Sequence, residues 1–269
     1  MSASDRGFAH AQARVQARYG RLPAEGDWRR ISGIRGLGAW LEDARNGPHR
    51  DWVRAFSAAS TAADIETGVR ELLLAEIDAV AGFAPEAWRD AVHWTQWLAL
   101  AGVIEHLRRG GELPAWARQV GPLAGLLDDD GALTQARVEG AGLTPLLAPD
   151  AGPLLTLWTH AWRQRWPHPG AAARADLDGL AALCGEQLAA FRASTPQRAW
   201  TRRQALRERL RFRFHGLGLS PAAPFAYLAL VALDLERLRR ALLDRALFPQ
   251  VLVAGSREVR RILDEAGRE

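Results

Sequence analysis

The chain has 269 residues, and 48% of them are hydrophobic, which is enough for a core in one large domain or in roughly two or three small ones. Arginine supplies all 35 basic residues against 31 carboxylates, so the formal net charge is only +4 although the isoelectric point is near 10.3. This balance excludes a chain dominated by basic charge. Guanidinium groups form forked bonds to carboxylates, which favours paired or interface roles, although codon bias equally explains a chain without lysine.

A single cysteine, Cys184, excludes an internal disulfide and a cysteine-built zinc site, and it fits a reducing, cytosolic compartment. Its apolar helical context favours a small core residue over a nucleophile. The N-terminal residues contain no continuous apolar stretch, so we expect no secretory signal. The longest apolar run, residues 222–233, has twelve residues, fewer than the roughly 18 to 20 that cross a bilayer. The sequence therefore predicts a soluble or peripheral protein.

Apolar residues recur at helical spacing in the first part of the chain. The pattern predicts a short helix over residues 8–21, two short helices around the glycines of residues 28–46, and a helix over residues 51–82. Proline then opens a long helix over residues 85–111, which ends in paired arginines with Gly110 as a left-handed cap. We expect the last two helices to pack as an antiparallel pair, because the connection between them is short.

The middle of the chain, residues 112–153, is rich in glycine and proline, and we place the main inner boundary there. It contains three consecutive aspartates, residues 128–130, followed by Gly131. A metal site would need these carboxylates to converge, whereas neighbouring side chains diverge on a helix or strand. A turn or a helix cap is favoured, because aspartate and glycine suit turns for local hydrogen-bonding reasons.

Three tryptophans, Trp158, Trp162 and Trp166, lie four residues apart in the next predicted helix, residues 154–166. Such a stripe can stack on bases or sugars. Burial in a core or in a subunit contact is the favoured interpretation, because the large area of these rings usually drives burial. An alanine- and leucine-rich helix is predicted to follow over residues 171–193.

The most basic segment is the predicted helix over residues 196–215, in which Trp200, Phe212 and Phe214 are interleaved with arginines. Arginines and aromatic rings can bind nucleic acid through phosphates and stacked bases. The near balance of charge over the whole chain and the lack of a recognised nucleic-acid motif argue against this function. We therefore do not expect a nucleic-acid partner, and an arginine-rich nucleic-acid-binding or scaffold protein stays the alternative.

Residues with catalytic or metal-ligand spacing are not found in the sequence. The seven histidines lack an H-E-x-x-H or similar pattern, and no serine stands in a G-x-S-x-G context. We therefore expect no enzyme, no metal and no cofactor. A helical enzyme with a hidden pocket stays open, because catalytic groups converge in space rather than in sequence.

The last predicted helix, residues 220–248, changes from an apolar first half to an arginine-rich second half. Aliphatic residues spaced by three and four form its buried stripe, while Glu236, Arg237 and Arg240 fall on other faces. Residues 85–111 share the apolar start and the Leu-Arg-Arg close, and this similarity predicts repeated helical bundles. The stripe consists of Leu228, Val231, Leu235, Leu238 and Leu242.

Two tracts of the chain resemble the C/d subunit family of V-type ATPases. Residues 8–18, FAHAQARVQAR, are similar to that family's opening tract, an aromatic residue followed by an Ala-Arg-Val-Arg pattern. Residues 225–239, FAYLALVALDLERLR, are similar to its closing tract, an aromatic-rich helix start that leads to an acidic residue and Asn-Leu-Arg. Arg237 stands where the family usually has asparagine, and His93 stands where its middle bundle usually has an acidic residue.

The resemblance implies an all-α fold of multi-helix bundle repeats, funnel-like, with short loops and little or no strand. It implies a non-catalytic structural coupling subunit of a V-type or A-type rotary ATPase, which links the central stalk to the membrane rotor ring, or a close paralogue that serves as an assembly factor. Such a protein would be cytoplasmic and peripheral to the inner membrane, and it would reach the membrane only through the other ATPase subunits.

We expect three consecutive regions: an N-terminal helical bundle region over residues 1–111, a connecting region over residues 112–153, and a C-terminal helical bundle region over residues 154–269. An arginine-rich rim would make charge-complementary contacts to acidic loops of the partners. Charge clustering and the two matching tracts give the expected partner-binding residues, which are Arg14, Arg18, Arg202, Arg203, Arg237 and Arg240.

Overall fold

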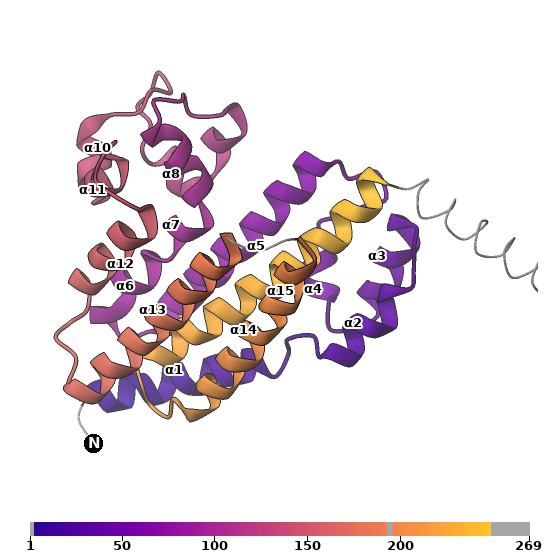
Figure 1. Ribbon diagram of the computed structural model, residues 1–269, viewed down its shortest axis with the longest axis horizontal. Helices are drawn as coiled ribbons and strands as arrows, with labels where there is room; N and C mark the ends of the chain where they lie inside the picture. Colours follow the sequence, from indigo (N-terminus) through magenta and orange to yellow (C-terminus); the bar gives the residue numbers. More distant parts are fainter. Residues whose placement is uncertain (1–2, 193–195, 249–269) are drawn as a thin grey trace, which may run out of the picture. The chain divides into compact units, whose positions relative to one another are not determined.

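The computed structural model describes residues 3–192 and 196–248, and over these residues the protein is built from helices (Figure 1). The described residues contain no strand, and a single isolated bridge joins Leu127 and Leu133. The prediction of an all-α, multi-helix fold is confirmed. Among the described helices, none is both long enough and apolar enough to span a lipid bilayer.

The chain divides into two compact units. Unit 1 takes the residues up to Val15 and Leu73–Ala229, and unit 2 takes Gln16–Leu72 and the chain from Leu230 onward. These units group residues by contacts in space, and the three consecutive regions expected from the sequence stay a prediction. The unit boundaries fall within three helices, α1 (Ala3–Tyr19), α5 (Ala62–Phe83) and α15 (Ala222–Leu247).

Unit 1 contains most of the helices. Besides its parts of α1, α5 and α15, it has η1 (Glu86–Trp88), α6 (Arg89–His93), α7 (Gln96–Ala99), α8 (Ala101–Arg108), η2 (Ala115–Gln119), α9 (Gly121–Ala124), α10 (Gln135–Gly140), α11 (Thr144–Leu147), α12 (Leu154–Gln164), α13 (Ala171–Arg192) and α14 (Pro196–Gly216). The helices α13 and α14 lie side by side (Figure 1) and pack against one another.

Aromatic rings fill the core of unit 1. Phe225 packs edge-on against Trp162, with the ring centroids 4.9 Å apart, and lies 6.4 Å from Trp88. Trp158, Trp162 and Trp166 are all buried, with at most 9% of their surface exposed. The interpretation of the tryptophan stripe as core is therefore confirmed, and stacking on a base or sugar is not its role in this unit.

The aspartate run forms a turn, as predicted. The Asp128 carboxylate accepts hydrogen bonds from the backbone N–H groups of Asp130 and Ala132, at 3.1 and 2.8 Å. Gly131 adopts a left-handed backbone with φ of +76°, and Gly110 does the same after α8 with φ of +79°. Both conformations favour glycine, because a Cβ atom would crowd the backbone there.

Residues 85–111 do not form the single long helix that their apolar pattern predicts. They fold as η1, α6, α7 and α8. The carbonyl of Trp94 accepts a hydrogen bond from the indole N–H of Trp158, and the N–H of Leu98 turns to the carbonyl of Thr95 instead. The Trp94 carbonyl is thus shared between the N–H of Trp97 and an indole from 64 residues away, at one of the places where the helix is interrupted.

The single helix expected over residues 51–82 and the antiparallel pair that it was expected to form are also wrong. Residues 51–82 contain two helices, α4 (Arg50–Val53) and α5, because Thr61 and Asp64 cap α5 at a new start. The Thr61 hydroxyl accepts from the N–H of Asp64, and the Asp64 carboxylate accepts from the N–H of Thr61, which is a reciprocal capping box. Because residues 85–111 are not one helix, the expected antiparallel pair of two long helices is not formed. For the same reason, residues 85–111 do not repeat the single long helix α15.

Unit 2 packs α2 (Glu25–Ser32), α3 (Leu37–Arg45), α4, the first part of α5 and the second part of α15 around aliphatic and indole side chains. Trp28, Ile31 and Trp40 are each at most 3% exposed. The predicted stripe of α15 is buried along its whole length, with no member more than 4% exposed. This confirms the periodicity argument for the last helix.

Candidate partner-binding surface

The arginines expected to bind partners lie on three helices. On α1, Arg14 is exposed and Arg18 is partly buried; on α14, Arg202 and Arg203 are partly exposed and adjacent. The remaining two, Arg237 and Arg240, lie on α15 in unit 2. Their role toward partners stays a prediction, and the structure gives each of the last two a partner within the chain.

Arg237 is held inside unit 2. Its two terminal guanidinium nitrogens donate to the two carboxylate oxygens of Glu25, at 2.6 and 3.1 Å. The guanidinium carbon lies 4.7 Å from the ring centroid of Trp28, and the side chain is only 17% exposed. This forked pair joins α15 to α2 with a geometry that lysine cannot reproduce.

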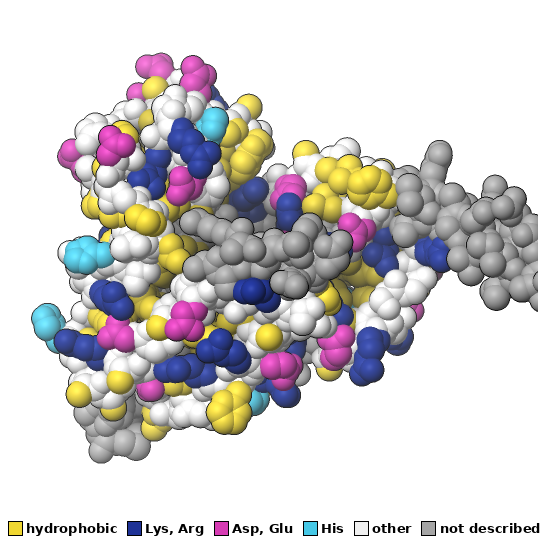
Figure 2. Space-filling model, in the orientation of Figure 1, with side chains coloured by type: hydrophobic (Ala, Val, Ile, Leu, Met, Phe, Trp, Pro, Cys, Tyr) yellow, Lys and Arg dark blue, Asp and Glu magenta, His cyan; other side chains and the backbone are white. Residues whose placement is uncertain are grey.

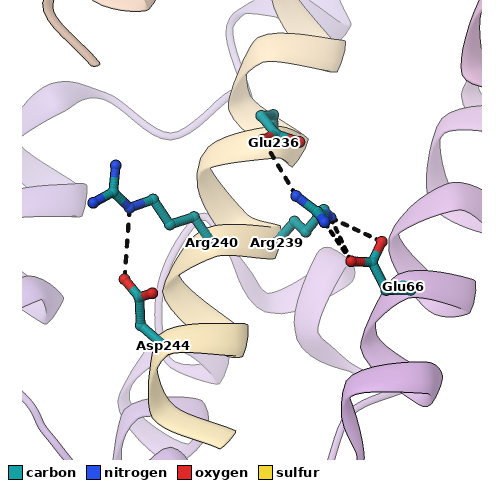
Figure 3. A network of polar contacts seen from close by, with 5 residues as sticks. All are labelled: Glu66, Glu236, Arg239, Arg240 and Asp244. Atoms are coloured by element: carbon teal, nitrogen blue, oxygen red, sulfur yellow. Dashed lines mark hydrogen bonds and ion pairs between the residues drawn. The ribbon is translucent and has the colours of Figure 1, made fainter. Parts of the chain in front are cut away.

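Arg239 was not singled out by the sequence, yet it forms the most connected ion pair on α15. Its guanidinium donates to both carboxylate oxygens of Glu66 on α5 and also to Glu236 one turn earlier (Figure 3). The bonds to Glu66 raise the pKa of Arg239 above its usual value. Arg240 points away from this network and pairs with Asp244 at 3.6 Å on the exposed side of the helix (Figure 3).

Arg245 closes the end of α2. Its guanidinium donates to the carbonyl oxygens of Ser32 and Ile34, at 3.1 and 2.9 Å, and lies 5.2 Å from the ring centroid of Trp40. The last carbonyls of a helix lack partners within the helix, and a cation satisfies them favourably. Arg237, Arg239 and Arg245 therefore connect α15 to α2, to α5 and to the segment after α2.

Removal of the Arg239 side chain is expected to destabilise unit 2 modestly. Arg239→Ala should lower the free energy of unfolding by about 1 kcal/mol, because the pair with Glu66 is bidentate but about one-third exposed and therefore screened by solvent. Urea unfolding followed by circular dichroism measures the change. A double-mutant cycle with Glu66→Ala should return a coupling energy of about 0.5 to 1 kcal/mol.

Arg240→Ala is the matched control for this cycle, since it removes the next arginine and its exposed pair with Asp244. It should change the free energy of unfolding by less than about 0.5 kcal/mol. Equal effects of the two substitutions, or no coupling between Arg239 and Glu66, would contradict the assignment of Arg239 as the connecting residue.

His49 is a buried core histidine whose ring nitrogens make no hydrogen bond to the residues that the structure describes. It is fully buried in unit 2, with its ring 4.3 Å from that of Trp28 and nearly perpendicular to it. Neither ring nitrogen has a hydrogen-bond partner. Burial lowers the pKa of His49 to about 4, so the imidazole is neutral at neutral pH.

The groups that could carry other chemistry are few in the part of the chain that the structure describes. Burial raises the pKa of the Cys184 thiol to about 11, so the thiol stays protonated at neutral pH and is a poor nucleophile. Within residues 3–192 and 196–248, no group of three or more histidine, cysteine or carboxylate side chains is placed to hold a metal ion. Cys184 as a whole is only partly buried, so its expected role as a small core residue stays a prediction.

The positive charge of the chain is concentrated in α13 and α14. These two helices contain nine arginines and four carboxylates, which leaves 26 arginines against 27 carboxylates in the rest of the chain. Figure 2 shows basic side chains gathered over this pair of helices, with acidic ones between them. The hairpin of α13 and α14 therefore accounts for the whole positive excess of the molecule.

A groove runs along this hairpin. It has a volume of about 700 Å³, and both its walls and its floor come from α13, α14 and the residues just after α14. Phe212 borders the groove and is 85% exposed, more than any other large hydrophobic residue among those described. The sequence placed Phe212 in a basic segment, but only the structure separates it from Phe214, which is fully buried.

Comparisons of the chain with protein-family models, with curated proteins and with solved structures find no match.

Proposed function

We propose that this protein is a non-catalytic structural coupling subunit of a V-type or A-type rotary ATPase, which links the central stalk to the membrane rotor ring. Its work would be done at interfaces with other subunits. The protein would stay on the cytoplasmic side, peripheral to the inner membrane, and would be held there by these partners.

The observation that carries the proposal is the basic hairpin of α13 and α14. A hairpin that contains the whole positive excess of a nearly neutral chain, and that exposes a phenylalanine beside a groove, is suited to bind an acidic partner. Arg202 and Arg203, which the sequence proposed as contact residues, lie on this hairpin.

Two further features support the proposal. The tracts that resemble the C/d subunit family lie in the helices α1 and α15. A subunit that transmits force also needs cross-connected helices, and in unit 2 three arginines of α15 bind groups on or next to α2 and on α5. Each of these bonds is made by a planar guanidinium with more than one acceptor or with an aromatic ring.

Nucleic-acid binding is the second candidate, because the same hairpin combines arginines with an exposed aromatic ring. The two candidate functions differ in what should co-purify with the full chain. A coupling subunit retains proteins, whereas a nucleic-acid binder retains nucleic acid with a steep dependence on salt.

Charge reversal on α14 tests the proposed function. The tagged full chain, purified from its own host, should retain central-stalk and rotor-ring subunits that mass spectrometry identifies, and Arg202→Glu/Arg203→Glu should lower their yield about tenfold or more. The matched control, Arg54→Glu/Arg137→Glu, reverses two exposed arginines outside the hairpin and should retain the subunits.

Two results would overturn the proposal. The first is a purified chain without rotary ATPase subunits from a host that makes such an ATPase. The second is a chain that retains nuclease-sensitive nucleic acid instead.

A further inference from the structure

We infer that the groove of the α13–α14 hairpin is the docking site for an amphipathic helix of a protein partner, which places an apolar face in the groove and carboxylates toward the arginines around it. The inference rests on the proposed function in that the partner is a protein. It adds where that partner binds, which residue anchors it and what chemistry the bound segment has.

The apolar part of the site combines a protruding ring with a floor of small residues. Phe212 has 85% of its surface exposed, and the small residues Gly179 and Ala182 on α13 line the same groove. The Arg213 guanidinium packs against Gly179, where a side chain would collide with it. Leu183 and Leu217 complete the apolar lining. A lone exposed aromatic ring beside a concave surface is the usual form of an anchor in a helix-in-groove contact.

Two carboxylates of the groove lie near arginines. Glu208 pairs with Arg211, which lies outside the lining, at 2.7 Å, and Glu186 lies 4.0 Å from Arg209. Arg213 donates to the backbone carbonyl of Asp176. The lining has three carboxylates, Asp176, Glu186 and Glu208, against the two arginines Arg209 and Arg213. It therefore does not attract an anion, and an apolar face suits the inside of the groove better than a carboxylate does.

The surroundings of the groove are basic, and this favours a partner with negative charge. The two helices carry a net charge of about +5 by residue count, from nine arginines and four carboxylates. Arg202 and Arg203 lie on α14 one to two turns before the residues that line the groove. Carboxylates on the flanks of a bound helix would meet these arginines, which favours a fast and specific encounter.

The same charges argue against two other occupants. A second copy of the chain would bring two hairpins of like charge together, which costs free energy. A nucleic acid would place phosphates in a groove whose lining has three carboxylates against two arginines, so the lining would repel them. An acidic helix with an apolar face avoids both conflicts.

The length of the groove matches a helix of about three turns. The lining residues span 176–186 on α13 and 208–217, and ten residues of helix cover about 15 Å. A partner helix of that length presents apolar residues at positions i, i+3 or i+4, and i+7, which is the spacing of helix-in-groove ligands.

Fluorescence anisotropy with the full chain tests the inference. The probe is a labelled helical peptide of about 20 residues, with leucines on one face and glutamates on its flanks. Three comparison probes are used. The first is a peptide of the same composition whose leucines do not form one face, the second is a peptide with the same leucine face but lysines on its flanks, and the third is a single-stranded DNA of similar length. The peptide with the leucine face and the glutamate flanks is expected to bind about tenfold more tightly than each of the comparison probes.

Substitutions in the chain then locate the site. Phe212→Ala and, separately, Arg202→Glu/Arg203→Glu are each expected to weaken peptide binding about tenfold. Because Phe212 is so exposed, its removal should leave the helical circular dichroism signal unchanged. Leu98→Ala, which truncates a 40% exposed leucine on α7, is the matched control and should bind like the original chain.

Four results would overturn the inference: equal binding of the peptide and its control of the same composition, tighter binding of the DNA, no effect of Phe212→Ala, or a dimer that Phe212→Ala dissociates in equilibrium sedimentation. The proposed function is judged separately. If Phe212→Ala left the co-purified ATPase subunits unchanged, the groove would be excluded as the docking site while the coupling function would stand.

Discussion

Replacement of Trp94 by alanine is expected to lower the free energy of unfolding by about 3 to 5 kcal/mol, the usual cost for a buried tryptophan. Trp94 is 2% exposed, and the Arg165 guanidinium lies 3.5 Å from its ring centroid. The indole N–H of Trp94 donates to the carbonyl of Trp158, and that of Trp158 donates to the carbonyl of Trp94, both at 3.1 Å. The substitution removes a core side chain and one of these two buried bonds.

Two variants separate packing from hydrogen bonding at this position. Trp94→Phe keeps much of the ring volume but leaves the Trp158 carbonyl without its donor, so it should cost about 1 to 3 kcal/mol. Trp116→Ala, at a tryptophan that is 40% exposed, is the control and should cost less than Trp94→Ala. Urea unfolding measures all three. A loss below about 1 kcal/mol for Trp94→Ala would contradict the reciprocal pair as the centre of this part of unit 1.

The protein is expected to lose stability in mild acid because of His49. Burial lowers the pKa of His49 to about 4, whereas an unfolded histidine titrates near its ordinary value of about 6.5. Between these two values the unfolded chain binds the proton and the folded chain does not, so the free energy of unfolding falls as the pH is lowered. The loss in the free energy of unfolding that this residue causes is up to about 3 kcal/mol at pH 4, and the loss levels off below that pH.

The charges around His49 come from three helices. Asp27 and Arg30 lie on α2, Asp43 lies on α3 and Arg237 lies on α15. The two carboxylates favour a charged imidazole and the two arginines oppose it, so burial is the dominant cause of the lowered pKa. Thermal unfolding at a series of pH values measures the expected slope.

His49→Leu isolates the residue. Both ring nitrogens already lack hydrogen-bond partners, so an apolar side chain of similar volume should change the free energy of unfolding at pH 7 by less than about 1.5 kcal/mol. The variant should also lose much of the pH dependence between about 4 and 6.5. If the variant kept the full slope, another group would have to cause the acid sensitivity.

Hydrophobic periodicity and glycine positions in the sequence correctly predicted those features that depend only on residues near one another in the chain. The α15 stripe from Leu228 to Leu242 is buried as its spacing indicated, and Gly110 adopts the left-handed conformation expected of it. The aspartate run before Gly131 forms the expected turn. The helix expected over residues 85–111 is wrong, because the segment is interrupted at several places, and at one of them the Trp94 carbonyl bonds to Trp158, 64 residues away. Periodicity describes one helix face and carries no signal for such a bond.

The candidate surface shows the same division. Residue counts along the chain were sufficient to single out Arg202 and Arg203 in the most basic segment. The role of Arg237 was not predictable, because its partner Glu25 lies 212 residues earlier. The difference between Phe212 and Phe214 also required the structure, since both stand in the same arginine-rich sequence and only one of them is exposed.

Photo-crosslinking at position 212 tests the central claim most directly. A photoreactive phenylalanine derivative would replace Phe212 in the full chain inside its own host, and mass spectrometry would identify what it captures. The account predicts a crosslink to an acidic, amphipathic helix of a rotary ATPase subunit, which is lost with Arg202→Glu/Arg203→Glu. A crosslink to nucleic acid or to a second copy of the chain, or capture that does not depend on these arginines, would contradict it.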